Sequence, residues 1–155
     1  KYTGPDSAGG VDYGLVGEVE RVNPDVLEAM LDNFVPVIAP LGVGADGTTY
    51  NINADTVAGR IAGAIKAAKL VILTDQEGVL GPGNRLLRSL TAAEAERYIS
   101  EGVISGGMLP KVKCCLQALN DGVGKAHIID GRVEHCLLLE IFTTTGVGTE
   151  ILPSV

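Results

Sequence analysis

The sequence has no tryptophan, and aromatic residues make up only 4 % of its 155 positions. Proteins that hold single-stranded nucleic acid by base stacking depend on such side chains, so that class is disfavoured. Positive charge is also scarce, because 12 Lys and Arg residues face 19 Asp and Glu residues and leave a net charge of −7. A chain with this charge is repelled by phosphate backbones and anionic lipids. We therefore expect no nucleic acid and no membrane among its partners.

Long apolar runs are missing as well. No run approaches the roughly 18 residues that a membrane-spanning helix needs. The opening segment KYTGPDSAGG lacks the apolar stretch of a secretory signal and is typical of a Gly/Pro/Ser loop. Because the chain starts inside such a loop, we expect it to be part of a longer protein. With 46 % hydrophobic residues it can still bury the core of one domain.

Cysteine is rare, with Cys114, Cys115 and Cys136 as the three in the chain. The number is odd, two of them are adjacent, and all lie in apolar segments with a helical pattern. This predicts buried, reduced thiols of a cytosol-like compartment rather than disulfides. Neither the cysteines nor His127 and His135 have the spacing of a zinc site, so we expect no protein-bound metal.

The most informative stretch is residues 49–75, TYNINADTVAGRIAGAIKAAKLVILTD. Asn53 has the side chain of a helix N-cap, and Asp55 falls in the first turn, where the helix dipole favours a carboxylate. Apolar residues at helical spacing predict one buried face, made of Val57, Ile61, Ala64, Ile65 and Ala68. The run KLVILTD then predicts a central strand of a parallel sheet.

Ligands collect at the carboxyl ends of such strands and at helix N-termini. The polar residues of 49–75 therefore form a candidate binding site. Capping and turn chemistry is the alternative interpretation, because Asn and Asp are favoured at helix starts whatever the function.

Helical and strand patterns alternate along the rest of the chain. Asp46-Gly47 predicts a turn, and Thr91 with Glu94 predicts a capping box. The expected elements are a strand pair at 14–23, a helix at 24–33 that buries Val26, Leu27, Met30 and Leu31, a strand at 34–42, helices at 91–102 and 109–120, a strand at 126–130, a short helix at 135–143 and a last strand. This order predicts an α/β protein, a three-layer α/β/α sandwich with a mainly parallel open sheet.

Charged residues and glycine-rich loops indicate what chemistry this fold could support. The dinucleotide and P-loop glycine motifs are absent, and no serine lies in a nucleophile elbow. Lys111 falls in a first helical turn, where it opposes the helix dipole, and this favours a task such as holding an anion. Asp55, Asp75 and Lys111 beside glycine-rich loops provide the positioning and positive charge that phosphoryl transfer requires.

Four strings carry a resemblance that runs through nearly the whole chain. They are VPVIAPLGVGADGTTYNINAD, KLVILTDQEGVL, ISGGMLPKV and AHIIDGRVEHCLLLEIFTTTGVGTEI. With them the sequence resembles the amino acid kinase family, and within it the N-acetylglutamate kinases. The resemblance implies transfer of the ATP γ-phosphoryl group, with Mg²⁺ accompanying the nucleotide, to the γ-carboxylate of N-acetyl-L-glutamate in arginine biosynthesis. It also implies a cytoplasmic location, or the plastid stroma if the source is a plant or alga.

The same resemblance implies that residues 1–155 are the C-terminal, ATP-binding portion of the kinase domain. An N-terminal, substrate-binding half would be absent, and the isolated segment would be inactive. Carried over by motif, Asn51 and Asn53 would line the pocket of the acyl-amino-acid substrate. Asp55 would organise the catalytic lysines, and Lys111 would stabilise the transferring phosphoryl group. The residues implied at the nucleotide are Thr74, Asp75, Gln76, Gly107, Met108 and Lys111.

Arginine-inhibited members of the family have a signature near the C-terminus that His127, Glu140, Gly146 and Gly148 match. The resemblance therefore implies arginine as an effector, with Glu140 facing its cationic groups. It further implies a homo-oligomer, either a dimer or a hexamer, and in photosynthetic organisms a PII-type signalling partner. On pattern alone, His127 also fits a satisfied core histidine, and the two glycines fit a simple turn.

Two other functions remain as alternatives. The first is another amino acid kinase, acting on glutamate, aspartate, carbamate or UMP. The second is a module that binds a nucleotide or arginine without catalysis.

Overall fold

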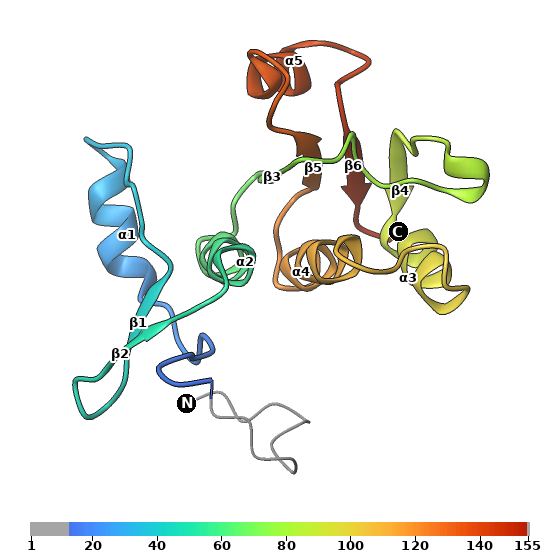
Figure 1. Cartoon of the computed structure of the whole chain (residues 1–155). Coiled ribbons are helices and arrows are strands. Elements are labelled where there is room, and N and C mark those ends of the chain that lie inside the picture. The colour runs from blue at the N-terminus through green and yellow to red at the C-terminus, as the bar shows by residue number, and fades with distance from the viewer. Residues whose placement is uncertain (1–12, 155) are drawn as a thin grey trace.

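The computed structural model describes residues 13–154, so the predicted opening loop lies outside the described residues. Twelve elements follow one another in the described residues, and Figure 1 labels the α-helices and strands among them. They are α1 (Pro24–Leu31), β1 (Leu41–Val43), β2 (Thr49–Asn51), α2 (Ala54–Ala64), β3 (Leu70–Thr74), the 3₁₀ helix η2 (Pro82–Asn84), β4 (Ser89–Thr91), α3 (Ala92–Ser100), α4 (Met108–Asn120), β5 (Ala126–Asp130), α5 (Cys136–Phe142) and β6 (Thr149–Leu152).

The larger sheet has the strand order β3-β5-β6-β4. β3 pairs with β5 in parallel, from Leu70 opposite Ala126 to Thr74 opposite Asp130. β4 and β6 are also parallel, whereas β5 and β6 are antiparallel. Figure 1 shows α2, α4 and α3 on one side of this sheet and α5 on the other. The predicted three-layer α/β/α sandwich with a mainly parallel sheet is confirmed.

The core lies between β5 and the helices α4 and α2. Every residue of β5 is buried, and Val112, Cys115 and Ala118 of α4 pack in the same cluster as Ile128. Cys115 and Cys136 are buried, Cys114 is half-buried, and all three are free thiols, as predicted.

The structure confirms a helix cap and a turn that the sequence predicts. Thr91 and Glu94 form the predicted capping box, with the Glu94 carboxylate accepting from the Thr91 N–H at 2.8 Å. Asp46-Gly47 makes the predicted turn of a hairpin between β1 and β2, and Gly47 has a positive φ of 82°. Such a backbone suits glycine because it lacks a Cβ.

The predictions for the first third of the chain are partly wrong. Of the expected strand 34–42 only Leu41 and Gly42 are in a strand, β1 (Leu41–Val43). The expected pair at 14–23 is reduced to one bridge between Val16 and Asn51. Pro36 and Pro40 cannot donate to a strand ladder, which explains why no ladder forms across 34–40. Apolar side chains here stay uncovered in the described residues, and Val37 is 98 % exposed.

Helix α1 forms as predicted, but none of its residues is buried. Its apolar side chains face a groove that the β1–β2 hairpin also lines, with Val26, Leu27 and Met30 on the helix side. The four residues expected in the core therefore lie at a surface in the described part of the chain.

Two predictions for the central stretch are also corrected. Helix α2 ends at Ala64, because Lys66 turns with a positive φ of 47° and Ala67 N–H bonds to the Ala62 carbonyl. This is the left-handed ending of a Schellman motif. The buried face of α2 is Gly59, Ala62 and Gly63, not the larger apolar residues. β3 lies at an edge of the described sheet rather than at its centre, and Leu73 is 51 % exposed.

Candidate active site

Helices α2 and α4 lie side by side (Figure 1), and the contacts at their two ends show that they run in the same direction. Asp55 near the start of α2 meets Lys111 near the start of α4, and Gly63 near the end of α2 lies against Asp121 after the end of α4. Each helix leads by a short turn into a strand of the parallel pair β3 and β5. Both helix N-termini therefore point toward the carboxyl ends of these strands, where α/β folds bind ligands.

The Asp55–Lys111 pair is the centre of this site. Asn53 caps α2, because its side-chain oxygen accepts from Thr56 N–H at 3.1 Å, as the sequence predicts. This places Asp55 in the first turn. Lys111 Nζ donates to Asp55 Oδ2 at 2.8 Å, and the two side chains are 24 % and 25 % exposed. The lysine is thus held in place while its side chain stays partly exposed to solvent.

The N-terminus of α4 is open to an anion. Gly107 occupies the N-cap position, and no side chain caps the helix there. Gly106 and Gly107 border open space, since a Cβ added at either would meet no atom within 4 Å. Met108 is half-buried beside them. In the first turn of α4, Leu109 N–H donates to the Gly106 carbonyl at 3.3 Å and Pro110 has no N–H, so the available backbone donors are few. The absence of a side-chain cap and the nearby Lys111 still favour an anion at this helix start.

The end of β3 supplies the other predicted nucleotide residues. Asp75 Oδ1 accepts from the Gln76 side chain at 3.3 Å and from the Thr74 hydroxyl at 3.4 Å. The Gln76 bond, with further help from Thr74, lowers the pKa of the Asp75 carboxyl, so an exposed negative charge stands at this strand end. The Asn51 side chain, predicted at the substrate, is exposed at the end of β2.

Two residues beside this strand end were missed by the sequence analysis. Asp130 ends β5 opposite Thr74, and its carboxylate accepts from Arg132 N–H and Nε at 2.9 Å each and from Nη2 at 2.8 Å. These bonds lower the pKa of Asp130 to about 2. In the sequence, Asp130 stands at the end of an apolar run just as Thr74 does, but the sequence does not show that these two strand ends are neighbours.

We expect Arg132→Ala to raise the pKa of Asp130 from about 2 toward its ordinary value, because the side-chain bonds are lost while the backbone N–H of residue 132 still donates. In the unaltered protein the folded-state pKa lies below the unfolded one. The Asp130–Arg132 ion pair therefore stabilises the folded state above about pH 4. This stabilisation is lost as the pH falls toward the folded-state pKa of Asp130. Carboxyl carbon shifts in an NMR titration measure this directly. An Asp130 midpoint that does not move in Arg132→Ala would show that the ion pair is not the cause.

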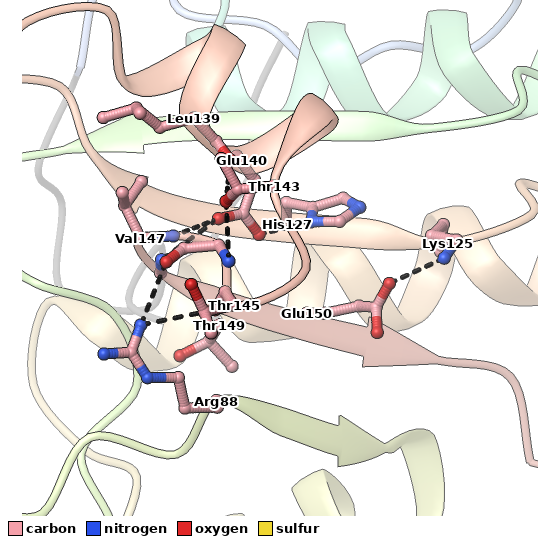
Figure 2. A network of polar contacts seen from close by, with 12 residues as sticks. Arg88, Lys125, His127, Leu139, Glu140, Thr143, Thr145, Val147, Thr149 and Glu150 are labelled. Atoms are coloured by element: carbon pink, nitrogen blue, oxygen red, sulfur yellow. Dashed lines mark hydrogen bonds and ion pairs between the residues drawn. The ribbon is translucent and has the colours of Figure 1, made fainter.

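A second polar cluster surrounds Glu140 on α5 (Figure 2). His127 Nδ1 lies 2.7 Å from Glu140 Oε1, and Oε2 accepts from the N–H groups of Val147 and Gly148 at 2.7 and 3.1 Å. The His127 and Glu140 side chains are only 4 % and 5 % exposed. The structure thus brings together residues that the sequence places in one signature although 13 positions separate the imidazole from the carboxylate.

Glycine is required in the loop that covers Glu140. Gly146 has a positive φ of 58°, and a Cβ there would lie 2.6 Å from Glu140 Oε2. Gly148 presses its backbone against the Ile128 carbonyl, so a side chain has no room. Arg88, which directly precedes β4, donates from Nη1 to the Gly146 carbonyl at 3.2 Å (Figure 2). This bond links the loop to the start of β4.

Burial opposes the charge on Glu140, but the bonds from His127, Val147 and Gly148 outweigh it. The pKa of this carboxyl therefore lies below its ordinary value. The ionised carboxylate only accepts, so His127 Nδ1 carries a proton. His127 Nε2 is buried and has no partner among the described residues.

Within residues 13–154 no three His, Cys, Asp or Glu side chains are grouped as a metal site. The same residues contain no helix long and apolar enough to span a bilayer.

The chain was compared with known proteins. The sequence pattern of the Amino acid kinase family matches residues 2–130. Acetylglutamate kinase of Syntrophobacter fumaroxidans is 57 % identical over 154 residues, which cover 98 % of this chain and 52 % of that protein. Acetylglutamate kinase of Pelobacter propionicus is 59 % identical over 142 residues, covering 91 % and 49 %. The chain thus spans about half the length of the curated relatives it matches.

Among solved structures, N-acetylglutamate synthase from Neisseria gonorrhoeae complexed with coenzyme A and N-acetyl-glutamate has a TM-score of 0.86. It is 28 % identical, over 91 % of this chain and 33 % of the synthase chain. The synthase complexed with coenzyme A and L-arginine has a TM-score of 0.85 at 29 % identity, over 92 % and 34 %. The fold is therefore an α/β/α sandwich of the kind found in that synthase. The chain belongs to the Amino acid kinase family.

Proposed function

We propose that this chain is the nucleotide-binding half of an acetylglutamate kinase, which transfers the γ-phosphoryl group of ATP to the γ-carboxylate of N-acetyl-L-glutamate. The observation that carries the proposal is the position of Lys111, 2.8 Å from Asp55 and beside the uncapped start of α4. The relatives named acetylglutamate kinase add the substrate class.

In this proposal the chain acts mainly by placing charge. Phosphoryl transfer passes through a state with negative charge on the equatorial oxygens, so a fixed ammonium group and backbone N–H donors stabilise it. Lys111 supplies the ammonium group, and Asp55 holds it in one orientation. Gly107 and Met108 border the phosphates, while Thr74, Asp75 and Gln76 border the rest of the nucleotide.

Mg²⁺ would arrive as part of the nucleotide substrate. In such sites Mg²⁺ keeps several waters and takes one or two carboxylates besides the phosphates, so a cage of protein ligands is not needed. Asp75, exposed and with a lowered pKa, fits as one such carboxylate. Asn51 and Asn53 would contact the acyl-amino-acid substrate.

We further propose that the rest of the family domain covers two surfaces of this chain. The free edge of β3 and the apolar side chains of residues 34–43 are exposed in the described residues, which is costly for isolated apolar surface. The isolated chain is accordingly expected to be inactive. A cytoplasmic homo-oligomer, with a PII-type partner in photosynthetic organisms, completes the proposal on family resemblance alone.

Arginine is the proposed effector, at the cluster of His127, Glu140, Gly146 and Gly148. Support comes from the contacts that join these four residues, of which His127, Glu140 and Gly148 are buried, and from the synthase with the same fold that was solved with L-arginine. That synthase also favours a second candidate function, an arginine-binding module without phosphotransfer.

The experiment that separates the two functions uses the full-length protein that contains this chain. With MgATP and N-acetyl-L-glutamate we expect ADP and an acyl phosphate, which hydroxylamine traps as the hydroxamate. Glutamate, aspartate, carbamate and UMP serve as competing acceptors, and arginine is added as inhibitor. Arginine binding by calorimetry, with no ADP formed above the acceptor-free rate with any acceptor, would refute the kinase proposal and favour the binding module.

A further inference from the structure

Helices α2 and α4 meet through three successive contacts on one face. On α2 the residues are Asp55, Gly59 and Gly63, which follow at intervals of four and therefore lie above one another. Their partners on the α4 side are Lys111, Cys114 and Asp121. The ion pair is thus one layer of a packed interface, and the next layer along both helices is Gly59 against Cys114.

The Gly59–Cys114 layer has no spare room. A Cβ added to Gly59 would lie 2.6 Å from Cys114 Sγ, closer than two such atoms approach. Cys114 Sγ in turn donates to the backbone carbonyl of Asp55 at 2.9 Å. The sulfur therefore fills the space that the missing side chain leaves, and it touches the same turn of α2 that carries the Asp55 carboxylate.

The thiol keeps its proton in this position. Burial, together with the charge of Asp55, raises the pKa of Cys114 to about 11. A protonated thiol donates a hydrogen bond and is unreactive at neutral pH. Cys114 thus serves as a spacer and a donor between the two helices.

We propose that Gly59 is a positioning residue for the Asp55–Lys111 pair, because its lack of a side chain lets Cys114 sit against the first turn of α2. This inference rests on the proposed function of the pair in phosphoryl transfer. A methyl group at residue 59 displaces Cys114 Sγ. Either the Cys114 side chain rotates and loses its bond to the Asp55 carbonyl, or α4 or the Asp55 turn shifts. Displacements of about 1 Å near a reacting group can cost 100-fold in rate.

The alternative is that Gly59 only lets the helices pack and so affects stability alone. Gly63 offers the matched comparison, since a Cβ there would lie 2.7 Å from Asp121 Cβ at the far end of the same two helices. Gly63→Ala makes the same chemical change in the same helix and the same gain in helix propensity. Its clash, however, is two turns away from Lys111.

The test measures kcat, KM and Tm of the full-length protein in the hydroxamate assay. The variants are Gly59→Ala, Cys114→Ala, the double variant Gly59→Ala/Cys114→Ala, and Gly63→Ala. We expect Gly59→Ala to lower kcat roughly 10- to 100-fold with little change in KM. Cys114→Ala alone should stay within about 3-fold, and the double variant should recover most of the lost kcat, because the clashing sulfur is gone.

Gly63→Ala is expected to lower Tm but to keep most of kcat. The inference is overturned if Gly59→Ala keeps full kcat, if the folded double variant stays as slow as Gly59→Ala, or if Gly63→Ala loses as much kcat as Gly59→Ala. Should Gly59→Ala not fold, Cys114→Leu enlarges the same contact from α4, and an unchanged kcat there overturns the inference equally.

Lys111→Ala in the same assay separates this inference from the proposed function. Full activity of Lys111→Ala would overturn both, because the pair would then have no role to position. An inactive Lys111→Ala beside a fully active Gly59→Ala would leave the proposed function standing and remove only the role of Gly59.

Discussion

Replacing Lys111 by alanine in the full-length protein is expected to lower kcat by at least about 100- to 1,000-fold, the cost of deleting one preorganised donor to a transition state. The ammonium group is fixed by Asp55 at 2.8 Å, so it needs no reorganisation when charge develops on the phosphoryl oxygens. Its loss also leaves the Asp55 carboxylate without a partner next to the nucleotide phosphates. KM for ATP should change less than kcat, because the interaction strengthens in the transition state.

The fold should survive this substitution, and that is the first control. A partly exposed ion pair contributes about 1 kcal/mol or less, so Tm should fall by only a few degrees. Lys113→Ala is the matched variant, since Lys113 is an exposed lysine on the same helix. It should keep kcat within about 2-fold. A loss of only a few-fold in Lys111→Ala would remove this lysine from the catalytic site.

Asp55→Asn adds a test of coupling between the two residues. If Asp55 acts by orienting Lys111, the double variant Lys111→Ala/Asp55→Asn should be hardly slower than Lys111→Ala alone. Additive losses would mean that Asp55 has a separate task.

Elements that depend on neighbouring residues in the sequence were predictable. The Thr91–Glu94 capping box, the Asn53 cap and the Asp46-Gly47 turn each use bonds between residues two or three positions apart. The strand 126–130 was also predicted with its observed bounds, because a continuous apolar run suits a strand that is buried on both faces.

Elements that depend on distant partners were not predictable in the same way. KLVILTD has the composition of a central strand, yet β3 has a neighbour on one side only in the described residues. On α2, the hydrophobic pattern favours Val57 and Ile61 as the buried face. The structure buries Gly59 and Gly63 instead, because a close helix neighbour selects small residues. The spacing of hydrophobic residues does not predict close helix–helix packing through glycine.

The same distinction between neighbouring and distant partners applies to the residues of the candidate active site. Asp55 and Lys111 were singled out through the motifs around them, but their contact joins positions 56 residues apart and required the fold. Asp130 and Arg132 were missed because the register of β3 against β5, which brings their strand end beside Thr74 and Asp75, is not written in either segment alone.

Replacing Glu140 by glutamine is expected to raise the arginine concentration for half-maximal inhibition at least about 10-fold and to lower the free energy of unfolding by about 1.5–3 kcal/mol. The buried carboxylate accepts from His127 on one oxygen and from Val147 and Gly148 N–H on the other. A glutamine side chain must turn its NH₂ group toward one of these donors. The loop that carries the two glycines of the proposed effector site then loses its anchor.

The pH dependence gives this prediction a second readout. Because the folded-state pKa of Glu140 lies below its ordinary value of 4.5, the carboxylate contributes stability above about that pH and loses it as the pH falls through the lowered pKa. The glutamine in Glu140→Gln does not titrate. The fall in the free energy of unfolding that Glu140 causes at acid pH should therefore be absent in this variant. Glu134→Gln is the control, because Glu134 is 90 % exposed and the same change there should leave stability and inhibition alone.

The two readouts separate a structural role of Glu140 from a role in the effector site. If Glu140→Gln lowers Tm while arginine inhibits as before, the carboxylate only fastens the loop and arginine binds elsewhere. If inhibition is lost, His127→Asn should weaken it too, since it disturbs the donor that holds the other carboxylate oxygen. Inhibition lost in Glu140→Gln but intact in His127→Asn would place Glu140 alone against arginine, with His127 confined to the core.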